Sequence, residues 1–440
     1  MSSASLRCIE EGCLSEYPIH YPHLLCSACG GLLDVQYSFH LPLDAAGTKA
    51  AFERRKLGHL PADLSGVWRF HELLPFAADL SQIVTLGEGN TPVYEGRRSA
   101  EYSGLESVRF KHQGMNPTGS FKDNGMTTGV TRAREEGAAA VACASTGNTS
   151  ASMAAYAARA GMRAIVFVPA GQVAYGKLAQ ALEYGATVVE LEGNFDDAMR
   201  IVREFTAESG VYLLNSLNPF RLEGQKTIMI ELMEQCGWRP PDWIVLPGGN
   251  LGNASAFGKA LHELAELGFI KKMPRLAVIQ AEGAAPFYEL AQLPGGSNIN
   301  PVGHPVTLAT AIRIGNPVSW KKALRSLAWT GGVVEAVSEQ EIADAKAVIG
   351  RDGIGCEPAS AASLAGARRL VSRGLIERSA DVICVLTGNL LKDPDYTIAY
   401  HSGKLAFEKD GKQMVIHGTM TNRPVRVAAD KDAIKRTLDR

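Results

Sequence analysis

Short apolar runs recur along the middle of the chain at a nearly constant spacing. Their centres, 24, 23 and 24 residues apart, lie near Val141, Ile165, Val188 and Tyr212. The intervening stretches, 149–161, 175–185 and 194–210, are alanine-rich or amphipathic, and each ends at a glycine, as helices often do. This alternation predicts strands connected by helices, that is, βαβ units in a parallel sheet.

A second set of apolar, β-branched runs follows in the C-terminal half of the chain. These runs span 242–247, 274–282, 331–337 and 380–387, with helical patterns between them. We therefore expect an α/β fold with two lobes, each centred on a sheet. Two regions depart from the pattern: 1–40 is rich in cysteine, and 284–320 reads as a long loop, of the kind that usually has a function.

Composition argues against several classes of protein. The chain of 440 residues has 45 Lys and Arg against 46 Asp and Glu, a net charge of -1, and so no basic footprint for nucleic acid or an anionic membrane. No apolar run reaches the roughly 18–20 residues that span a bilayer, and no secretory signal pattern is visible. We expect a cytoplasmic protein that binds neither nucleic acid nor membranes, with its eight cysteines as thiols or metal ligands.

A lysine follows a rigid turn at the start of one predicted helix. Pro117 and Gly119 form the turn, and Thr118 or Ser120 is expected to cap the helix. Lys122 lies in the first helical turn, where the helix dipole disfavours a cation by about 0.3–1 kcal/mol. Lys122 is therefore a candidate amine nucleophile. The alternative is an ordinary solvated lysine on a helix surface.

Polar residues also gather where a predicted strand ends and a helix begins. After the strand near Val141 come five small residues in a row, Ser145, Thr146, Gly147, Asn148 and Thr149. The carboxyl edge of a parallel sheet is where such folds bind ligands, and helix N-termini attract anions. Helix capping explains one or two of these residues but not all five.

Three further strand ends carry similar signals. The glycine-rich turn 248–253 suits a small phosphate, because backbone N–H groups converge there, and it lacks the G-x-G-x-x-G dinucleotide spacing. Arg221, which follows Asn215 and Ser216, suits phosphate or carboxylate recognition, although a surface arginine is an equal alternative. Thr387 ends a later strand, where its hydroxyl can form one hydrogen bond with a ring nitrogen.

Together these segments resemble the threonine synthases. The matching motifs, in order from about residue 80 to 400, are MNPTGSFKDNGM, ASTGNTSAS, NPFRLEGQK, GGNLGN, TLATAIRIGNPVSW, CEPASAAS and LTGN. The resemblance implies the two-lobed tryptophan synthase β-like fold, which is fold type II of the pyridoxal-phosphate enzymes. It implies a lyase that uses pyridoxal phosphate to convert O-phospho-L-homoserine and water into L-threonine and phosphate.

The resemblance also implies roles for individual residues. Lys122 would carry the cofactor as a Schiff base, Asn148 would bond the ring hydroxyl, and Thr387 would bond the pyridine nitrogen. The cofactor phosphate would lie on Gly249, Asn250, Leu251, Gly252 and Asn253. The substrate would be bound by Ser145, Thr146, Thr149, Asn215, Ser216, Arg221 and Asn250.

From pattern and resemblance we expect four parts in the chain. They are a cysteine-rich segment 1–40, a large cofactor-binding lobe of 41–123 plus 219–405, a small lobe 124–218, and a C-terminal extension 406–440. The habit of the fold implies a homodimer.

Alternatives within and outside the enzymes remain. Asn389 and Leu390 stand where relatives commonly have histidine and glycine, close to the cofactor ring, which leaves the exact phospho-amino-acid substrate open. A cysteate synthase-like replacement on phosphoserine or a serine/threonine dehydratase are the rival reactions. A dehydratase needs no second phosphate site, so Arg221 argues against it. A regulatory protein that binds pyridoxal phosphate without catalysis would be expected to lack Lys122 or Asn148, and both are present.

Four cysteines near the N-terminus form two pairs. They are Cys8, Cys13, Cys26 and Cys29. The first pair encloses four residues and the second two, which resembles a zinc ribbon with tetrahedral thiolate ligands. The alternatives are inert thiols, or His20 and His23 as competing ligands.

Overall fold

The structure, a computed structural model, confirms the alternation of strands and helices along the chain. It describes residues 2–77, 79–170, 175–192, 201–202, 204–206, 208–293, 296 and 298–438. The helix expected over 194–210 therefore lies partly outside the described residues. Within these ranges, no helix is both long enough and apolar enough to cross a bilayer.

Six strands form the larger sheet, in the order β12-β11-β10-β13-β5-β4. They span Val333–Val337 (β12), Arg275–Ala281 (β11), Trp243–Pro247 (β10), Val382–Leu386 (β13), Arg109–His112 (β5) and Val93–Glu95 (β4). All neighbours are parallel except β4 and β5. Four of these strands are those expected from the C-terminal apolar runs, and their parallel pairing brings their carboxyl ends to one edge.

Side chains that alternate along the central strands enter two separate cores. On β10, Ile244 and Leu246 belong to one core, whereas Trp243 and Val245 belong to the other. The helices that complete these cores are α8 (Pro219–Gln235) and α9 (Gly252–Glu266) in the first, and α12 (Glu339–Arg351) and α13 (Pro358–Ser372) in the second. Because successive strand residues point to opposite faces, helices cover the sheet on both sides, which explains its continuous apolar runs.

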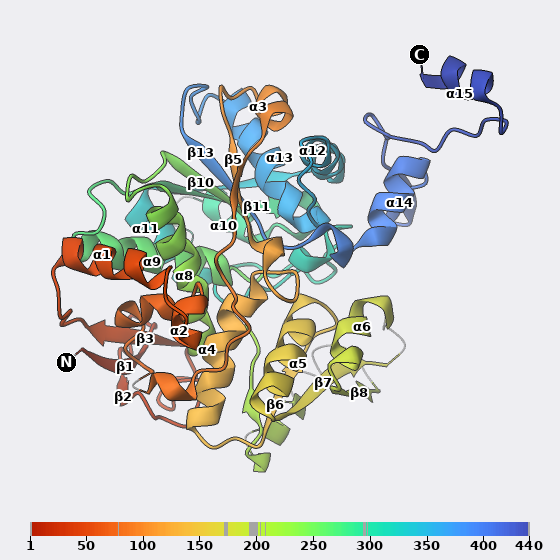
Figure 1. The fold of residues 1–440 in the computed structure, drawn as a ribbon. Coiled ribbons are helices and arrows are strands. Elements are labelled where there is room, and N and C mark those ends of the chain that lie inside the picture. The colour runs from red at the N-terminus through yellow and green to blue at the C-terminus, as the bar shows by residue number, and fades with distance from the viewer. Residues whose placement is uncertain are drawn as a thin grey trace.

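Four parallel strands form the smaller sheet, in the order β8-β7-β6-β9. They span Thr187–Leu191 (β8), Arg163–Pro169 (β7), Ala140–Ala144 (β6) and Tyr212–Leu213 (β9). The helices beside it include α4 (Lys122–Glu135), α5 (Asn148–Ala160) and α6 (Tyr175–Glu183). Helix α4 packs against α5 and also against α8 of the larger sheet, so it connects the two sheets (Figure 1).

The contact between α4 and α8 depends on glycine. A Cβ atom at Gly224 would lie 1.8 Å from the carbonyl oxygen of Asn124, and one at Gly125 would lie 2.9 Å from that of Arg221. The two backbones approach so closely that no side chain fits between them. This approach fixes Lys122, at the start of α4, relative to Arg221, in the first turn of α8.

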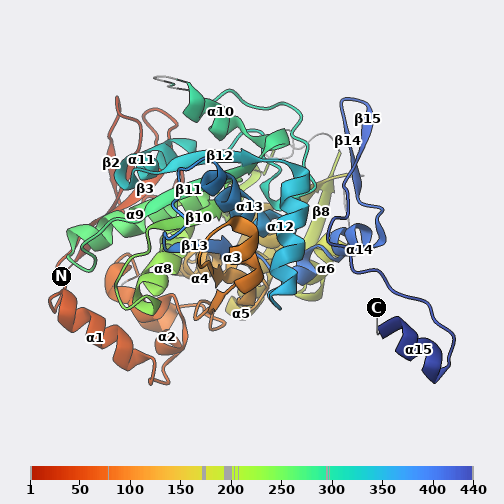
Figure 2. The same ribbon diagram turned by 90° about the horizontal axis from the view of Figure 1, so that it is seen from above.

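The two ends of the chain form smaller units. The N-terminal segment folds into an antiparallel sheet, β2-β1-β3, with β1 at Ser3–Cys8, β2 at Glu16–Pro18 and β3 at Leu33–Ser38. The C-terminal part contains α14 (Pro394–Ser402), the hairpin of β14 (Ala406–Lys409) and β15 (Lys412–Val415), and α15 (Lys431–Leu438). In both views α15 lies apart from the body of the molecule (Figures 1 and 2).

The remaining helices whose bounds the structure describes are mostly short. They are α1 (Ala45–Arg55), α2 (Pro61–Leu64), η1 (Trp68–Leu73), η2 (Leu80–Gln82), α3 (Arg97–Ser103), η3 (Gln113–Met115), η4 (Glu282–Ala284), α10 (Pro286–Gln292), η5 (Thr310–Ile312), α11 (Trp320–Thr330) and η6 (Leu390–Lys392). Within the described part of the expected loop 284–320, α10 and η5 interrupt an otherwise irregular backbone.

Candidate active site

The turn before α4 is joined to the end of β13. The Phe121 N–H donates to Thr387 O at 3.0 Å, and the Asn389 N–H donates to Gly119 O at 2.9 Å. These bonds hold Lys122, the first residue of α4, close to the strand-end Thr387. Two residues for which the resemblance implies contact with one cofactor thus lie together, although they are far apart in the sequence.

Lys122 is in the environment of a reactive amine. Burial lowers its pKa, the nearby Arg221 cation lowers it further, and Glu357 offsets this only in part, so that the pKa is about 7. Its ammonium nitrogen lies 4.4 Å from the centre of the Phe121 ring. A large share of the molecules therefore carries the unprotonated amine at neutral pH, as a nucleophile requires. This environment contradicts the alternative of an ordinary solvated lysine.

The expected side-chain cap of α4 is wrong. Neither Thr118 nor Ser120 caps the helix, and Ser120 Oγ accepts only a long bond, 3.4 Å, from the Lys122 N–H. Asp123, in the first turn of the helix, does not cap it either but binds the turn that precedes it. It accepts bonds from the Thr118 N–H at 2.7 Å and hydroxyl at 2.6 Å, and from the Ser152 hydroxyl of α5 at 2.5 Å. Burial nevertheless raises the pKa of Asp123 to about 6.

The five small residues after β6 lead into α5 at the edge of the smaller sheet. Residues 145–149 are partly exposed, between buried stretches on either side. Helix α5 begins at Asn148 without a side-chain cap, which leaves its N-terminus suited to an anion. Asn215, after β9, accepts a bond from the Ala144 N–H at 3.1 Å and donates to Ala144 O at 3.2 Å. The structure therefore places Asn215, followed by Ser216, beside residues 145–149.

Arg221 is a buried cation near the same edge. Its Nη1 donates to Leu214 O at 3.0 Å, whereas its Nε has no hydrogen-bond partner. Burial lowers its pKa to about 10, so the guanidinium stays charged at neutral pH. Among the described residues, no carboxylate forms an ion pair with it, and the surface-arginine alternative is wrong. A buried charge without a counter-ion is costly, which makes Arg221 suited to an anionic ligand.

The glycine-rich turn after β10 has the features of a phosphate site. Leu251 is buried in a left-handed conformation, φ 64°, and α9 begins at the next residue without a side-chain cap. A Cβ at Gly249 would lie 3.2 Å from Ala311 O. The side-chain oxygen of Asn253 is buried without a partner, and a flip of this amide would present its NH₂ group instead. Residues 249–253 therefore fit a small phosphate group.

The long region 284–320 packs against this turn. Asn250 Oδ1 accepts a bond from the Val318 N–H at 3.3 Å, and Asn250 O accepts one from the Ser319 N–H at 3.2 Å. Ile312 also approaches, since its Cα would lie 3.3 Å from a Cβ at Gly249. The region thus supports the turn from outside, which gives the expected long loop a structural reason.

Glu357 is a site residue that the sequence reasoning missed. It directly precedes α13 and is 4% exposed. Its Oε2 accepts a bond from Asn148 Nδ2 at 3.0 Å, and its Oε1 accepts one from the Thr387 hydroxyl at 3.2 Å. Burial raises its pKa, although these two bonds partly offset the effect. The available signal was an acidic residue among the small, apolar residues of the CEPASAAS motif.

Ser360 is a second residue that the sequence reasoning missed. Its Oγ lies 3.0 Å from Thr387 Oγ1 and accepts bonds from the N–H groups of Thr387 at 2.8 Å and Gly388 at 3.0 Å. It therefore fixes the end of β13 to helix α13. The orientation of the Thr387 hydroxyl depends on this bond and on Glu357.

The two departures from the family pattern shape the backbone beside Thr387. Asn389 Nδ2 donates to Gly114 O at 3.1 Å, and its Oδ1 accepts a bond from the Leu391 N–H at 3.0 Å. Leu390 packs so closely on Gly355 that a Cβ at position 355 would lie 2.9 Å from the Leu390 Cβ. The Asn389 bonds thus go to backbone groups of the surrounding loops.

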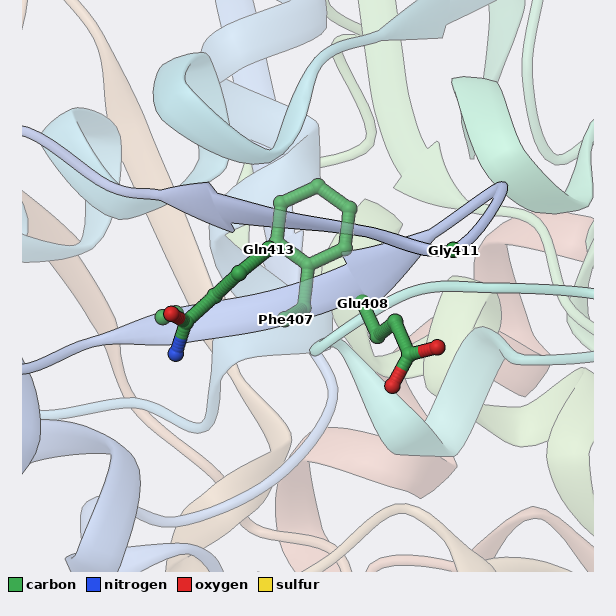
Figure 3. A pocket seen from close by; sticks show the side chains of 5 residues that line it. Phe407, Glu408, Gly411 and Gln413 are labelled. Atoms are coloured by element: carbon green, nitrogen blue, oxygen red, sulfur yellow. The ribbon is translucent and has the colours of Figure 1, made fainter.

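A surface hollow at the β14–β15 hairpin contains none of these residues. It is lined by Ala406, Phe407, Glu408, Gly411 and Gln413 (Figure 3). The lining offers a carboxylate and an amide but no cation or nucleophile. The hollow therefore lacks the groups that the candidate site at the sheet edges provides.

The N-terminal cysteines form a separate cluster. The sulfur atoms all lie within 4.8 Å of one another, and they belong to Cys8, Cys13, Cys26 and Cys29. Neither His20 nor His23 belongs to this cluster, and His20 Nδ1 lies 3.0 Å from Arg132 Nη2. The alternative in which these histidines act as ligands is therefore wrong.

Known proteins resemble this chain over nearly its whole length. Residues 84–388 match the family described as "Pyridoxal-phosphate dependent enzyme". The chain is 48% identical over 394 residues to the threonine synthase of Methanosarcina acetivorans, covering 89% of this chain and 93% of that protein. It is 46% identical over 405 residues to the threonine synthase of Methanocaldococcus jannaschii, covering 92% and 96%.

Solved structures share the fold. Maize serine racemase aligns with a TM-score of 0.58 and 21% identity, over 68% of this chain and 89% of that chain. The processed form of threonine deaminase isoform 2 from Solanum lycopersicum aligns with a TM-score of 0.59 and 18% identity, over 68% and 79%. At such low identities the similarity concerns the fold alone, and it confirms the expected fold type II architecture. On the sequence identities above, the chain belongs to the threonine synthases, within the pyridoxal-phosphate-dependent enzymes.

Proposed function

We propose that this enzyme converts O-phospho-L-homoserine and water into L-threonine and inorganic phosphate. The observation that carries the proposal is that a lysine able to lose its proton and a permanently charged arginine influence one another in the same site. Lys122 has a pKa of about 7, whereas the buried Arg221 stays a cation. A reaction that removes the terminal phosphate of an amino acid requires both a group that moves protons and a fixed positive charge that binds the phosphate.

Several residues would hold the cofactor. Pyridoxal phosphate, when bound, supplies a ring that takes up electrons from carbons next to the substrate amine. Lys122 would hold its aldehyde carbon, Asn148 its ring hydroxyl and Thr387 its ring nitrogen. Its phosphate would lie on Gly249, Asn250, Leu251, Gly252 and Asn253. The uncapped start of α9 and the unpartnered amide of Asn253 support this placement.

Glu357 would orient the groups that contact the ring. Both Asn148 and Thr387 donate to its carboxyl oxygens, so it sets the direction of each side chain. We treat Glu357 as a positioning residue, because its bonds go to these two side chains.

Lys122 is suited to move protons at the substrate. A group with a pKa near 7 exchanges between amine and ammonium at neutral pH, so it can accept a proton at one carbon and return it at another. The Arg221 cation favours the amine form. Loss of Arg221 would therefore impair this step as well as phosphate binding.

The reaction removes a group from the γ carbon of the substrate and adds another to the β carbon. The bond between the γ carbon and the phosphate oxygen breaks, the γ carbon ends as a methyl group, and water supplies the hydroxyl at the β carbon. Arg221 and the N-terminus of α5 would stabilise the departing phosphate. Hydroxyl and amide groups for the rest of the substrate would come from Ser145, Thr146, Thr149, Asn215, Ser216 and Asn250.

The test is direct. Purified enzyme supplied with O-phosphohomoserine should release phosphate and form threonine in equal amounts. Arg221→Ala should lower turnover roughly ten- to hundredfold, since a charge-assisted hydrogen bond is worth about 1.5–3 kcal/mol, while the absorbance of bound cofactor remains. Arg134→Ala, an exposed arginine on α4, is the matched control and should have no effect.

Phosphoserine with sulfite tests the cysteate synthase-like alternative, because it presents the same phosphate on a chain one carbon shorter. Should that pair react while phosphohomoserine fails, the proposal is wrong and Asn389 and Leu390 are the first residues to exchange.

We further propose the lobe boundaries 41–123 plus 219–405 and 124–218, which enclose the two sheets. Homodimer formation, a cytoplasmic location and the lack of nucleic-acid or membrane partners stay predictions.

A further inference from the structure

The four sulfur atoms of the N-terminal cluster pair across the two cysteine motifs. Cys8 Sγ lies 3.5 Å from Cys29 Sγ, and Cys13 Sγ lies 3.6 Å from Cys26 Sγ. Tetrahedral zinc with sulfur ligands at about 2.3 Å holds the sulfurs roughly 3.8 Å apart, whereas a disulfide brings them to about 2.05 Å. The spacing therefore matches a metal site rather than two disulfides.

We propose that Cys8, Cys13, Cys26 and Cys29 bind one structural zinc ion, and that this ion supports the phosphate-binding turn through β3 and helices α9 and α11. Four protein ligands leave no open position on the metal, which is typical of a structural site. The second part of the proposal rests on the function proposed above for residues 249–253.

Two glycines adapt the second cysteine motif to this arrangement. Gly30 has a left-handed φ of 74°, and its N–H donates to Cys26 O at 2.8 Å. A Cβ at Gly31 would lie 3.2 Å from the sulfur atoms of both Cys8 and Cys29. Glycine at these positions lets the turn bring the two sulfurs together without a side chain beside them.

A buried carboxylate connects this segment to the larger sheet. Asp34, on β3, is 2% exposed and lies 2.6 Å from Arg325, 3.4 Å from Lys322 and 3.6 Å from Lys259. Lys259 belongs to α9, whereas the other two cations belong to α11. The strand that follows the cysteines is thus anchored to both helices.

These two helices meet at the phosphate-binding turn. Helix α9 begins at Gly252, and α11 follows Ser319, whose N–H donates to Asn250 O at 3.2 Å. A displacement of β3 would therefore reach the turn from two sides. A segment of about 40 residues has little core of its own, so a metal would supply much of its order.

Metal analysis of the full-length enzyme tests the site. Protein purified without chelator should contain about one zinc per chain, and protein produced with cobalt chloride should show sulfur-to-cobalt charge-transfer absorption. Cys26→Ser with Cys29→Ser should lose the zinc. Cys236→Ser, a thiol outside the cluster, should retain it.

Three results would overturn the metal site. The first is that folded, reduced wild-type protein binds no zinc even after zinc chloride is added. The second is that the protein holds iron instead of zinc. The third is that mass measurements find the four cysteines in disulfides. None of them depends on whether the double variant folds.

Chelator treatment tests the supporting role separately. Removal of zinc from the cofactor-loaded enzyme should lower the melting temperature and speed release of pyridoxal phosphate, and zinc chloride should reverse both. If zinc-free enzyme keeps its melting temperature and its cofactor, the supporting role is overturned. Failure of the proposed function is distinguishable, because it would appear as missing threonine formation in zinc-loaded enzyme.

Discussion

Asn148 donates a hydrogen bond to Glu357 across the two sheets, with 3.0 Å between Nδ2 and Oε2. Asn148 starts α5, which packs on the smaller sheet, and Glu357 directly precedes α13, which packs on the larger one. Because Glu357 also accepts a bond from Thr387, one carboxyl group links both residues that are proposed to contact the cofactor ring.

Removal of the two charged neighbours should move the pKa of Lys122 in opposite directions. Glu357 raises this pKa and Arg221 lowers it, and together with burial they leave it at about 7. Glu357→Gln should therefore lower the pKa of Lys122, and Arg221→Gln should raise it. The pH dependence of the rate at which cofactor-free enzyme combines with pyridoxal phosphate measures this, because only the amine reacts.

Arg134→Gln provides the control, since this arginine is exposed on α4. Its profile should coincide with that of the wild type. Shifts of the same sign in Glu357→Gln and Arg221→Gln would show that the electrostatic explanation is wrong.

Lys122 should be the lysine that carries the cofactor. Borohydride reduction of the loaded enzyme, followed by peptide mass mapping, should place the label there. Lys226 is a poor candidate because its buried side-chain nitrogen is already engaged in ion pairs with Glu223 at 2.8 Å and Glu263 at 2.7 Å. A label on Lys226 or on Lys392 would refute the site assignment.

The close contact between α4 and α8 predicts that Gly224→Ala destabilises the protein. The new Cβ would overlap Asn124 O, and overpacking of this kind costs about 1–3 kcal/mol in the free energy of unfolding. Denaturant titration measures the loss. Gly350→Ala on α12 is the matched control, because its Cβ would meet nothing within 4 Å. That variant should be about 0.5–1 kcal/mol more stable, and equal effects of both changes would contradict the packing argument.

Asp34→Asn should also destabilise the protein strongly. It leaves the buried Lys322 without its carboxylate partner and removes one of the carboxylates beside Lys259, which keeps Glu223 at 2.5 Å. Breaking a buried ion pair costs about 3–5 kcal/mol. Glu101→Gln, which breaks the exposed pair with Arg97, should cost about 0.5 kcal/mol or less. Calorimetry or denaturant titration of the three proteins provides the comparison.

The cost of Asp34→Asn should depend on pH in one direction. Burial alone would raise the pKa of Asp34, but the surrounding cations hold it well below its usual range. A depressed pKa stabilises the fold above the unfolded-state value of about 3.9 and loses this effect as pH falls through the folded-state value. The difference between wild type and variant should therefore be constant near neutrality and shrink below about pH 4. A difference that grew on acidification would contradict this.

Local sequence patterns were enough to predict the strands β6–β13, the α/β class and the lysine at the start of α4. The runs near Val141 and Ile165 became β6 and β7, and the C-terminal runs became the core of the larger sheet, because burial on both faces requires continuous apolar runs. Lys122 stood out because Pro117 and Gly119 mark a helix start locally. Each of these features is specified by residues that are close together in the sequence.

Which distant groups share an environment depends on how the helices and sheets pack together. The sequence left open whether Arg221 was a surface arginine, and it became a buried cation only because α8 packs on α4. It gave no role to Glu357, whose partner Asn148 is 209 residues away. It predicted Thr118 or Ser120 as a helix cap, whereas Thr118 binds Asp123, which also binds Ser152 of the next helix. Such contacts follow from the way helices and sheets pack, which local pattern does not specify, because the free energy of a buried charge or hydrogen bond depends on whatever group the fold brings beside it.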